Sequence, residues 1–117
     1  MAKSATEHEC FRLIQCVSVT QYPVCRVPGC EAPSVAGHHL FPRARMGTAF
    51  NPKAVFAVCQ VHHDFAHAHP IEFREIARQV VGDEYEALRE LSLMEVQFRA
   101  EDFRRIKAAL TALAKGG

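Results

Sequence analysis

Cys59-Gln-Val-His-His-Asp-Phe-Ala-His67 brings one cysteine and three histidines into a single short stretch. Two stretches of similar character precede it, Cys25-Arg-Val-Pro-Gly-Cys30 and Gly37-His-His-Leu-Phe-Pro-Arg43. Six of the seven histidines and three of the five cysteines lie between Cys25 and His69. Thiolates and imidazoles at such spacings are zinc ligands, and there are more of them here than one zinc ion can use. The surplus predicts one structural metal and a second metal for chemistry.

The predicted structural zinc site combines two pairs of ligands. Cys25 and Cys30 flank Val-Pro-Gly, a turn that can bring two thiolates onto one metal, although the usual knuckle has fewer residues between its cysteines. Cys59 and His62 form the second pair. Three cysteines and one histidine make a closed tetrahedral site without room for water, which is the structural pattern. The alternative is that the cysteines are buried thiols that act as small hydrophobic groups.

The remaining histidines predict a second site. In a helix that begins at the third cysteine, adjacent residues point about 100° apart, so His62 can face the zinc while His63 faces elsewhere. His63 and His67 share one helix face and can hold a single ion. The His38-His39 pair on a predicted strand supplies a third ligand, because consecutive strand residues alternate faces. One of these two histidines would bind the metal, and the other would face the substrate as a base.

This arrangement of histidines suits catalysis. A metal held by two or three neutral imidazoles keeps open positions for water or phosphate. A free histidine beside it titrates near neutrality and suits general-base work. The alternative is that these histidines fill a polar surface or bind a second structural zinc.

Length and composition predict one globular domain, residues 1–117. The chain has 49% hydrophobic and 23% charged residues, which are ordinary values, and it is too short for two independent cores. A net charge of +1 gives no general basic field, so contact with nucleic acid would need a local patch. The sequence has neither a membrane-length apolar run nor the apolar run of a signal peptide. The odd cysteine count and the metal spacing favour a reducing cytoplasm over a disulfide scaffold.

The expected fold class is α+β, with a ligand-rich core over residues 21–70 and a helical tail over residues 71–115. Prolines and glycines exclude long helices from the core. The predicted strands are 35–41 and 55–58, joined by a loop around 43–53. The sequence from residue 60 onward predicts four helices. The first covers 60–68, the second runs from residue 71 and stops at Gly82, the third begins after an N-cap at Asp83, and the last ends before Gly116. A short helix is expected within residues 1–20, and Cys10 and Cys16 are predicted to be buried thiols.

The ordered ligands resemble those of the HNH endonucleases, also called ββα-metal or His-Me finger nucleases. That family combines a cysteine knuckle, a strand ending in Asp/His-His, a loop, and Cys-x2-Cys-His-x3-His entering a helix. The resemblance covers residues 25–67, and Gly37–Arg43 is similar to the family's His-His-hydrophobic-x-Pro-Arg signature. It implies a small zinc-stabilised, treble-clef-like ββα-metal core with an N-terminal helix and a helical tail. Residues 67–76 are loosely similar to the tail of some phage recombination nucleases.

The resemblance implies hydrolysis of DNA phosphodiester bonds, with His39 as the general base. It implies a catalytic divalent metal held by His38, His63 and His67. It also implies a structural zinc held by three cysteines and one histidine, which are Cys25, Cys30, Cys59 and His62. The catalytic metal would be Mg²⁺ or Mn²⁺, and an all-histidine set also suits Ni²⁺, Co²⁺ or Zn²⁺.

Two positions depart from the family's pattern. His62 stands where the family usually has a fourth cysteine, an exchange that zinc tolerates. Ala54 stands where the family has an asparagine that braces the loop against the base histidine, and Asn51 is the candidate replacement. For phosphate contacts we expect three basic residues on or near this loop, Arg43, Arg45 and Lys53.

The leading interpretation is therefore an endonuclease that acts on DNA, expected to be double-stranded. The alternative is a catalytically inactive, zinc-stabilised nucleic-acid-binding or adaptor module, which Ala54 and the near-neutral charge favour. A histidine-rich metal-handling protein is a third reading, opposed by the patterned strands and helices. A recruiting protein partner or a homodimer through Leu88, Leu91 and Leu110 is compatible with the sequence, and no membrane partner is expected. The expected location is the cytoplasm of a prokaryote or of a phage-infected host.

Overall fold

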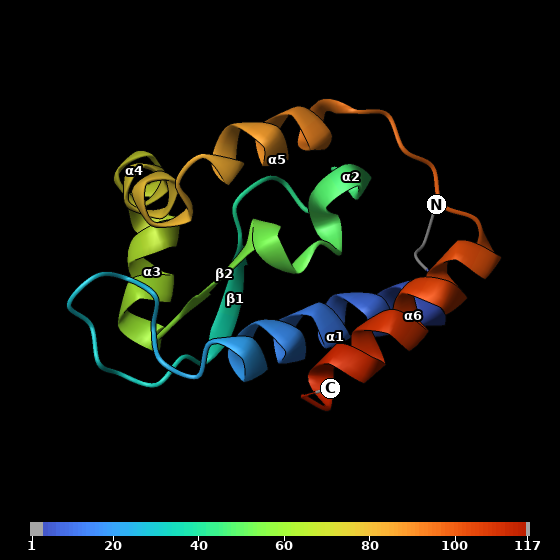
Figure 1. The fold of residues 1–117 in the computed structure, drawn as a ribbon, viewed down its shortest axis with the longest axis horizontal. Coiled ribbons are helices and arrows are strands. Elements are labelled where there is room, and N and C mark those ends of the chain that lie inside the picture. The colour runs from blue at the N-terminus through green and yellow to red at the C-terminus, as the bar shows by residue number, and fades with distance from the viewer. Residues whose placement is uncertain (1–3, 117) are drawn as a thin grey trace.

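The computed structural model describes residues 4–116, so residues 1–3 and 117 of the predicted domain lie outside the described residues. Within the described range the chain is a small α+β protein with six α-helices, one 3-10 turn and a two-stranded antiparallel sheet (Figure 1). The predicted α+β class is confirmed. None of the described helices is both long and apolar enough to cross a membrane.

The sheet lies at the centre of the molecule and is formed by β1 (Ala36–His39) and β2 (Val55–Val58). All four residues of β2 are buried. β1 is shorter than the predicted strand over 35–41. Leu40 still donates its amide to the carbonyl oxygen of Ala54 at 2.9 Å, but Pro42 has no amide hydrogen with which to continue the pairing. The connection between the strands contains α2 (Met46–Ala49) and η1 (Pro52–Ala54).

One face of the sheet is covered by α1 (Ala5–Gln21), which packs along α6 (Ala100–Ala114) although the two are at opposite ends of the sequence (Figure 1). Ser4 caps α1, because its side chain accepts a hydrogen bond from the amide of Glu7 at 3.1 Å. The helix is longer than the short one predicted. Its apolar face forms one core cluster with β2 and α6, comprising Cys10, Ile14, Val17, Val55, Phe103 and Leu110.

The two cysteines of α1 differ in burial. Cys10 is fully buried, as predicted, and its thiol donates to the carbonyl oxygen of Phe103 at 3.4 Å. Cys16 is exposed, so the prediction that it is buried was wrong. Side chains six residues apart in an α-helix point in directions that differ by about 240° around the helix axis, so the second cysteine lies on a different face from the first.

The other side of the molecule is formed by α3 (Gln60–Ala68), α4 (Pro70–Val81) and α5 (Glu84–Leu93). Pro70 ends α3 as predicted and begins α4 as its first residue, where its missing amide hydrogen costs nothing. Asp83 occupies the N-cap position of α5, as predicted, but its backbone is already helical and its side chain makes no cap hydrogen bond. A second core cluster joins this side to β2, comprising Cys25, Val27, Phe56, Val58, Cys59, Ala66, Phe73 and Ala77.

The leucines considered for dimerisation divide between core and surface. Leu88 and Leu110 are buried within the single chain, whereas Leu91 is exposed. Leu88 packs with Phe41, Ala54 and Tyr85 in a third small cluster beneath the loop between the strands. Two of the three leucines therefore serve the core of one molecule.

Candidate metal centres

A short knuckle presents the first two cysteines. Cys30 donates its amide to the carbonyl oxygen of Val27 at 3.0 Å, and Gly29, with φ of +84°, occupies the turn position that requires a positive φ. Pro28 before it is pre-set for the preceding turn position. The amide of Cys25 is held by the carbonyl oxygen of Ala32 at 2.9 Å. Both thiols are thereby fixed on one side of the knuckle.

Cys59 occupies the N-cap of α3. Its Sγ accepts a hydrogen bond from the backbone amide of His62 at 3.5 Å. This hydrogen bond, together with the contact to the His62 side chain, lowers the pKa of the Cys59 thiol to about 7. Free amides at a helix N-terminus stabilise a thiolate, which is the form that binds metal.

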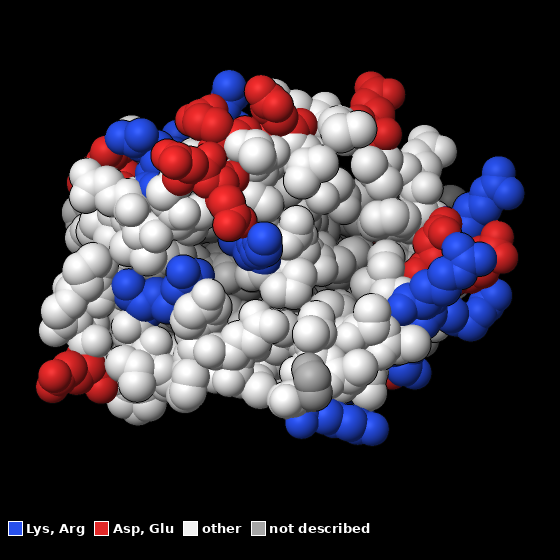
Figure 2. All heavy atoms as spheres, viewed as in Figure 1, with Lys and Arg blue, Asp and Glu red and all other residues white. Residues whose placement is uncertain are grey.

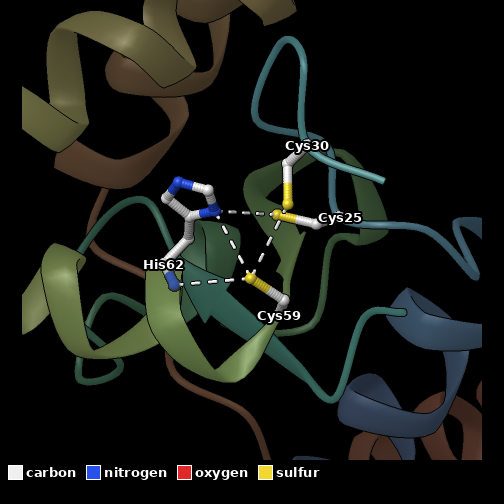
Figure 3. Close-up of side chains that lie close together, drawn as sticks. All are labelled: Cys25, Cys30, Cys59 and His62. Carbon is white, nitrogen blue, oxygen red and sulfur yellow. Dashed lines mark hydrogen bonds between the residues drawn. The ribbon is translucent and has the colours of Figure 1, made fainter. Parts of the chain in front are cut away.

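The two pairs converge on one point (Figure 3). The ligand atoms of Cys25, Cys30, Cys59 and His62 all lie within 4.8 Å of one another. The Sγ atoms of Cys30 and Cys59 are 3.8 Å apart, and Nδ1 of His62 lies 3.3 Å from Sγ of Cys59 and 3.5 Å from Sγ of Cys25. Zinc bonds of about 2.3 Å to sulfur and about 2.05 Å to nitrogen give tetrahedral edges of about 3.8 Å and about 3.6 Å. The cluster therefore has the donors and the dimensions to hold a structural metal such as zinc.

A second cluster is formed by His38 from β1 and by His63 and His67 from α3. Their ligand atoms also lie within 4.8 Å of one another, and the Nε2 atoms of His63 and His67 are 3.3 Å apart. The His38 ring stands edge-on to the rings of His67 and Phe73, with centroids 5.1 Å and 5.0 Å away. The structure thus brings together the three histidines predicted to share a metal.

Burial, together with the neighbouring imidazoles of His67, His63 and His39, lowers the pKa of His38 to about 4, and burial is the largest of these causes. His38 is therefore neutral at physiological pH. A neutral imidazole has a free lone pair, which is the form in which histidine ligates a metal. The set is more open than the cysteine cluster, because His38 and His63 are half-buried and His67 is exposed.

His39 is next to His38 in β1 but is held by a different contact. Its Nε2 lies 2.9 Å from the carbonyl oxygen of Ala49, at the end of α2. A carbonyl oxygen only accepts hydrogen bonds, so Nε2 carries the proton and Nδ1 keeps the lone pair. Burial lowers the pKa of His39, the hydrogen bond to Ala49 opposes this, and Arg43 lowers it as well. His39 is thus neutral near pH 7 and has one nitrogen available as a base.

A pocket of about 520 Å³ joins these histidines. It is lined by the second cluster and His39, by Gln15 from α1, and by the segment that follows β1, as far as Arg43. The guanidinium carbon of Arg43 lies 4.3 Å from the centroid of the Phe11 ring, so the aromatic face holds this cation at the wall of the pocket.

The other residues expected to contact phosphate lie elsewhere. Arg45 lines a different hollow, of about 360 Å³, together with residues 94–97. Lys53 pairs with Glu84 of α5 at 3.2 Å. The Asn51 side chain accepts a hydrogen bond from the amide of Lys53 at 3.0 Å, whereas the hydrogen-bond partner of the His39 ring is the Ala49 carbonyl oxygen. Of the three basic candidates, the structure places only Arg43 on the histidine pocket.

Sequence reasoning did not single out Gln15, Phe11 or Ala49 as site residues. Gln15 lines the pocket from α1, and Phe11 of the same helix stacks against Arg43; both lie more than twenty residues before His38 in the chain. Ala49 acts through its backbone carbonyl, which is common to every residue. No pattern in the sequence marks such contacts.

In comparisons with protein-family models, curated proteins and solved structures, nothing matches this chain. The surface charge agrees with the small net charge. In Figure 2 acidic side chains gather over α4 and α5 with basic ones among them, both signs mix at the end of the molecule where α6 begins, and much of the remaining face is uncharged. On the face shown there is no wide basic field, so a nucleic acid would have to be held locally.

Proposed function

We propose that this protein is a metal-dependent endonuclease of the HNH type that hydrolyses phosphodiester bonds of DNA. The observation that carries the proposal is the open three-histidine cluster, which shares one pocket with His39 and Arg43. A purely structural metal site would be closed, as the neighbouring cysteine cluster is. Two clusters of different character in so small a protein favour one role in folding and another in chemistry.

The order of elements around the clusters supports a ββα-metal, treble-clef-like core. The knuckle with Cys25 and Cys30 precedes the β1–β2 pair, and α3 follows β2 directly. α3 carries ligands for both clusters on different faces, and β1 carries one ligand and the proposed base. We propose this core as the unit that the resemblance implies.

In the proposed reaction Nδ1 of His39 takes a proton from a water molecule, and the resulting hydroxide attacks the phosphorus atom. The bond from phosphorus to the 3′ oxygen breaks, and that oxygen takes a proton from solvent water, which leaves 5′-phosphate and 3′-hydroxyl ends. The Ala49 carbonyl keeps the His39 ring in the tautomer that the reaction needs and stabilises the imidazolium that forms. Arg43 binds a non-bridging oxygen of the phosphate from the pocket wall.

His38, His63 and His67 would hold a divalent cation, which when bound stabilises charge on the phosphate and on the leaving oxygen. Mg²⁺ and Mn²⁺ are proposed as the working metals, with Ni²⁺, Co²⁺ and Zn²⁺ suited to the nitrogen ligands. Because His38 is neutral, this ligand need not lose a proton before it binds the cation.

The test is a supercoiled-plasmid assay with Mg²⁺, Mn²⁺ and Ni²⁺ in turn. Wild type is expected to nick in a metal-dependent manner, and His39→Ala is expected to lose nicking while it keeps its zinc and its thermal unfolding temperature. His8→Ala is the matched control, because His8 is exposed on α1 and lines none of the pocket. His8→Ala should nick like wild type.

Equal nicking by wild type and His39→Ala would reject His39 as the base. Absence of nicking by every protein with every metal, on single- and double-stranded DNA, would favour the alternative function, a zinc-stabilised binding or adaptor module. In that case DNA binding without cleavage, measured by fluorescence anisotropy, would identify a nucleic-acid-binding module.

A further inference from the structure

The edge of β1 that faces α1 is completed by a side chain. Gly37 stands opposite Ala57 of β2, and the carbonyl oxygen of Ala57 accepts from the amide of Arg26 on the far side at 3.0 Å. Gly37 and Ala57 therefore do not exchange ladder hydrogen bonds, and the amide and carbonyl of Gly37 point away from β2. Unpaired, these two groups would lie at a partly buried edge, where each would destabilise the fold.

Gln15 of α1 satisfies both groups. Its Oε1 accepts the Gly37 amide at 2.7 Å, and its Nε2 donates to the Gly37 carbonyl oxygen at 2.8 Å. A primary amide has the same donor and acceptor as a peptide group, so this one side chain takes the place of a third strand for one residue of β1. Other hydrogen-bonding side chains of similar length lack either the donor or the acceptor at neutral pH.

The close approach of α1 to β1 depends on the absence of a side chain at Gly37. A Cβ atom there would lie 2.5 Å from Cγ1 of Val55 and 2.8 Å from Cβ of Ser18. Glycine is therefore required sterically at this point. The contact fixes the strand from one side at the residue that immediately precedes His38.

We propose that Gln15 is a positioning residue for His38 and His39, acting through the Gly37 backbone. This inference rests on the proposed function, because it concerns the same pocket, which Gln15 also lines. The backbone of Gly37 sets where His38 meets His63 and His67, and where His39 meets Ala49. Groups that orient metal ligands in this way contribute to affinity without touching the metal.

The experiment compares Gln15→Met with Ser18→Ala. Methionine keeps the length and the helix propensity of glutamine and removes both hydrogen bonds. Ser18 is the matched control, because it lies in the same α1–β1 contact but its Oγ has no hydrogen-bond partner. Co²⁺ is titrated calorimetrically into each protein after the cysteine cluster has been loaded with zinc, and zinc content, thermal unfolding and the nicking rate are measured beside it.

We expect Gln15→Met to raise the Co²⁺ dissociation constant of the histidine cluster by about 10- to 100-fold, with zinc content unchanged. The nicking rate at saturating metal should fall as well, because His39 also shifts, while KM for the plasmid changes little. Ser18→Ala should bind Co²⁺ as wild type does. If Gln15→Met does not fold, Gln15→Ala makes the same comparison.

Wild-type Co²⁺ affinity in folded Gln15→Met would overturn the positioning role. Equal losses in Gln15→Met and Ser18→Ala would also overturn it, since the effect would then belong to helix packing. If wild type binds Co²⁺ but cuts no DNA, the proposed nuclease function fails and the comparison of affinities still decides the role of Gln15. If wild type binds no Co²⁺ at the histidines, both the metal site and the positioning role are rejected.

Discussion

His62 and His63 are neighbours in the chain, yet their imidazoles belong to two different clusters. Nδ1 of His62 lies 3.3 Å from Sγ of Cys59, and Nε2 of His63 lies 3.3 Å from Nε2 of His67. Adjacent residues of a helix point about 100° apart, which is enough to divide the two rings between separate sites. α3 is thus shared by both clusters, and fraying of its first turn would disturb them together.

This sharing predicts that the cysteine cluster controls the integrity of the whole core. Cys30→Ser should lose bound zinc and lower the free energy of unfolding by more than about 4 kcal/mol, because loss of a structural metal is among the most destabilising changes. Zinc content is measured by atomic absorption, and stability is measured by denaturant unfolding.

Cys16→Ser is the matched control for that substitution. Cys16 is exposed on α1 and belongs to neither cluster. The Cys16→Ser protein should keep its zinc, and its free energy of unfolding should lie within about 0.5 kcal/mol of the wild-type value, as is usual for surface substitutions. A Cys30→Ser protein with full zinc content would remove Cys30 from the ligand set.

The lowered pKa of His38 predicts a pH-dependent stability. An unfolded histidine titrates near 6.5, whereas His38 in the folded protein titrates at about 4. Between these values the unfolded chain binds more protons, so the free energy of unfolding falls as pH drops from about 6.5 to about 4 and the contribution of His38 levels off below that. Unfolding by urea at a series of pH values, with one equivalent of zinc for the cysteine cluster and no other metal, measures the slope.

His38→Gln isolates this contribution, because loss of zinc from the cysteines at low pH affects both proteins alike. The difference in unfolding free energy between wild type and His38→Gln should change with pH over that window, with wild type losing stability more steeply. A constant difference would show that His38 titrates normally in the folded state.

Local spacing was enough to predict much of the site. The four-residue separation of His63 and His67 and the adjacent position of His62 depend only on helix geometry, and the structure places all three rings as that geometry requires. The segment 55–58 is a fully buried strand, as its β-branched residues indicate. These features follow from interactions between residues close in sequence.

Features that depend on distant packing were not predictable in the same way. The face that α1 turns toward Gly37, and hence the role of Gln15, follows from the docking of α1 between β2 and α6. The same docking leaves Cys16 exposed. Lys53 was expected to face phosphate, but Glu84 of α5 reaches it across the loop, and nothing near Lys53 in the sequence indicates that ion pair.

The tight contact at Gly37 predicts the effect of a single methyl group. Gly37→Ala should lower the free energy of unfolding by about 1–3 kcal/mol, because the new Cβ meets Val55 and Ser18 in a packed interior. Ser18→Ala should leave stability within about 0.5 kcal/mol of wild type, since its buried Oγ has no partner to lose. Thermal unfolding measures both, and wild-type stability in Gly37→Ala would mean that α1 can move away from β1.

Arg43 and Arg45 lie at different hollows, so we predict that they contribute unequally to plasmid nicking. Both arginines are exposed, but Arg43 lines the histidine pocket and is stacked on Phe11, whereas Arg45 lies at a different hollow. A charge-assisted contact of about 1.5–3 kcal/mol corresponds to about 10- to 100-fold in rate, so Arg43→Ala should reduce plasmid nicking by that factor. Arg45→Ala, which removes the same charge two residues away, should stay within about threefold of wild type, an effect of less than 1 kcal/mol. Nicking is measured at several salt concentrations, because a phosphate contact also changes the salt dependence of DNA binding. Equal losses of nicking rate in the two variants would mean that the loop acts through its net charge. The position of Arg43 over Phe11 would then give it no special role in binding the phosphate.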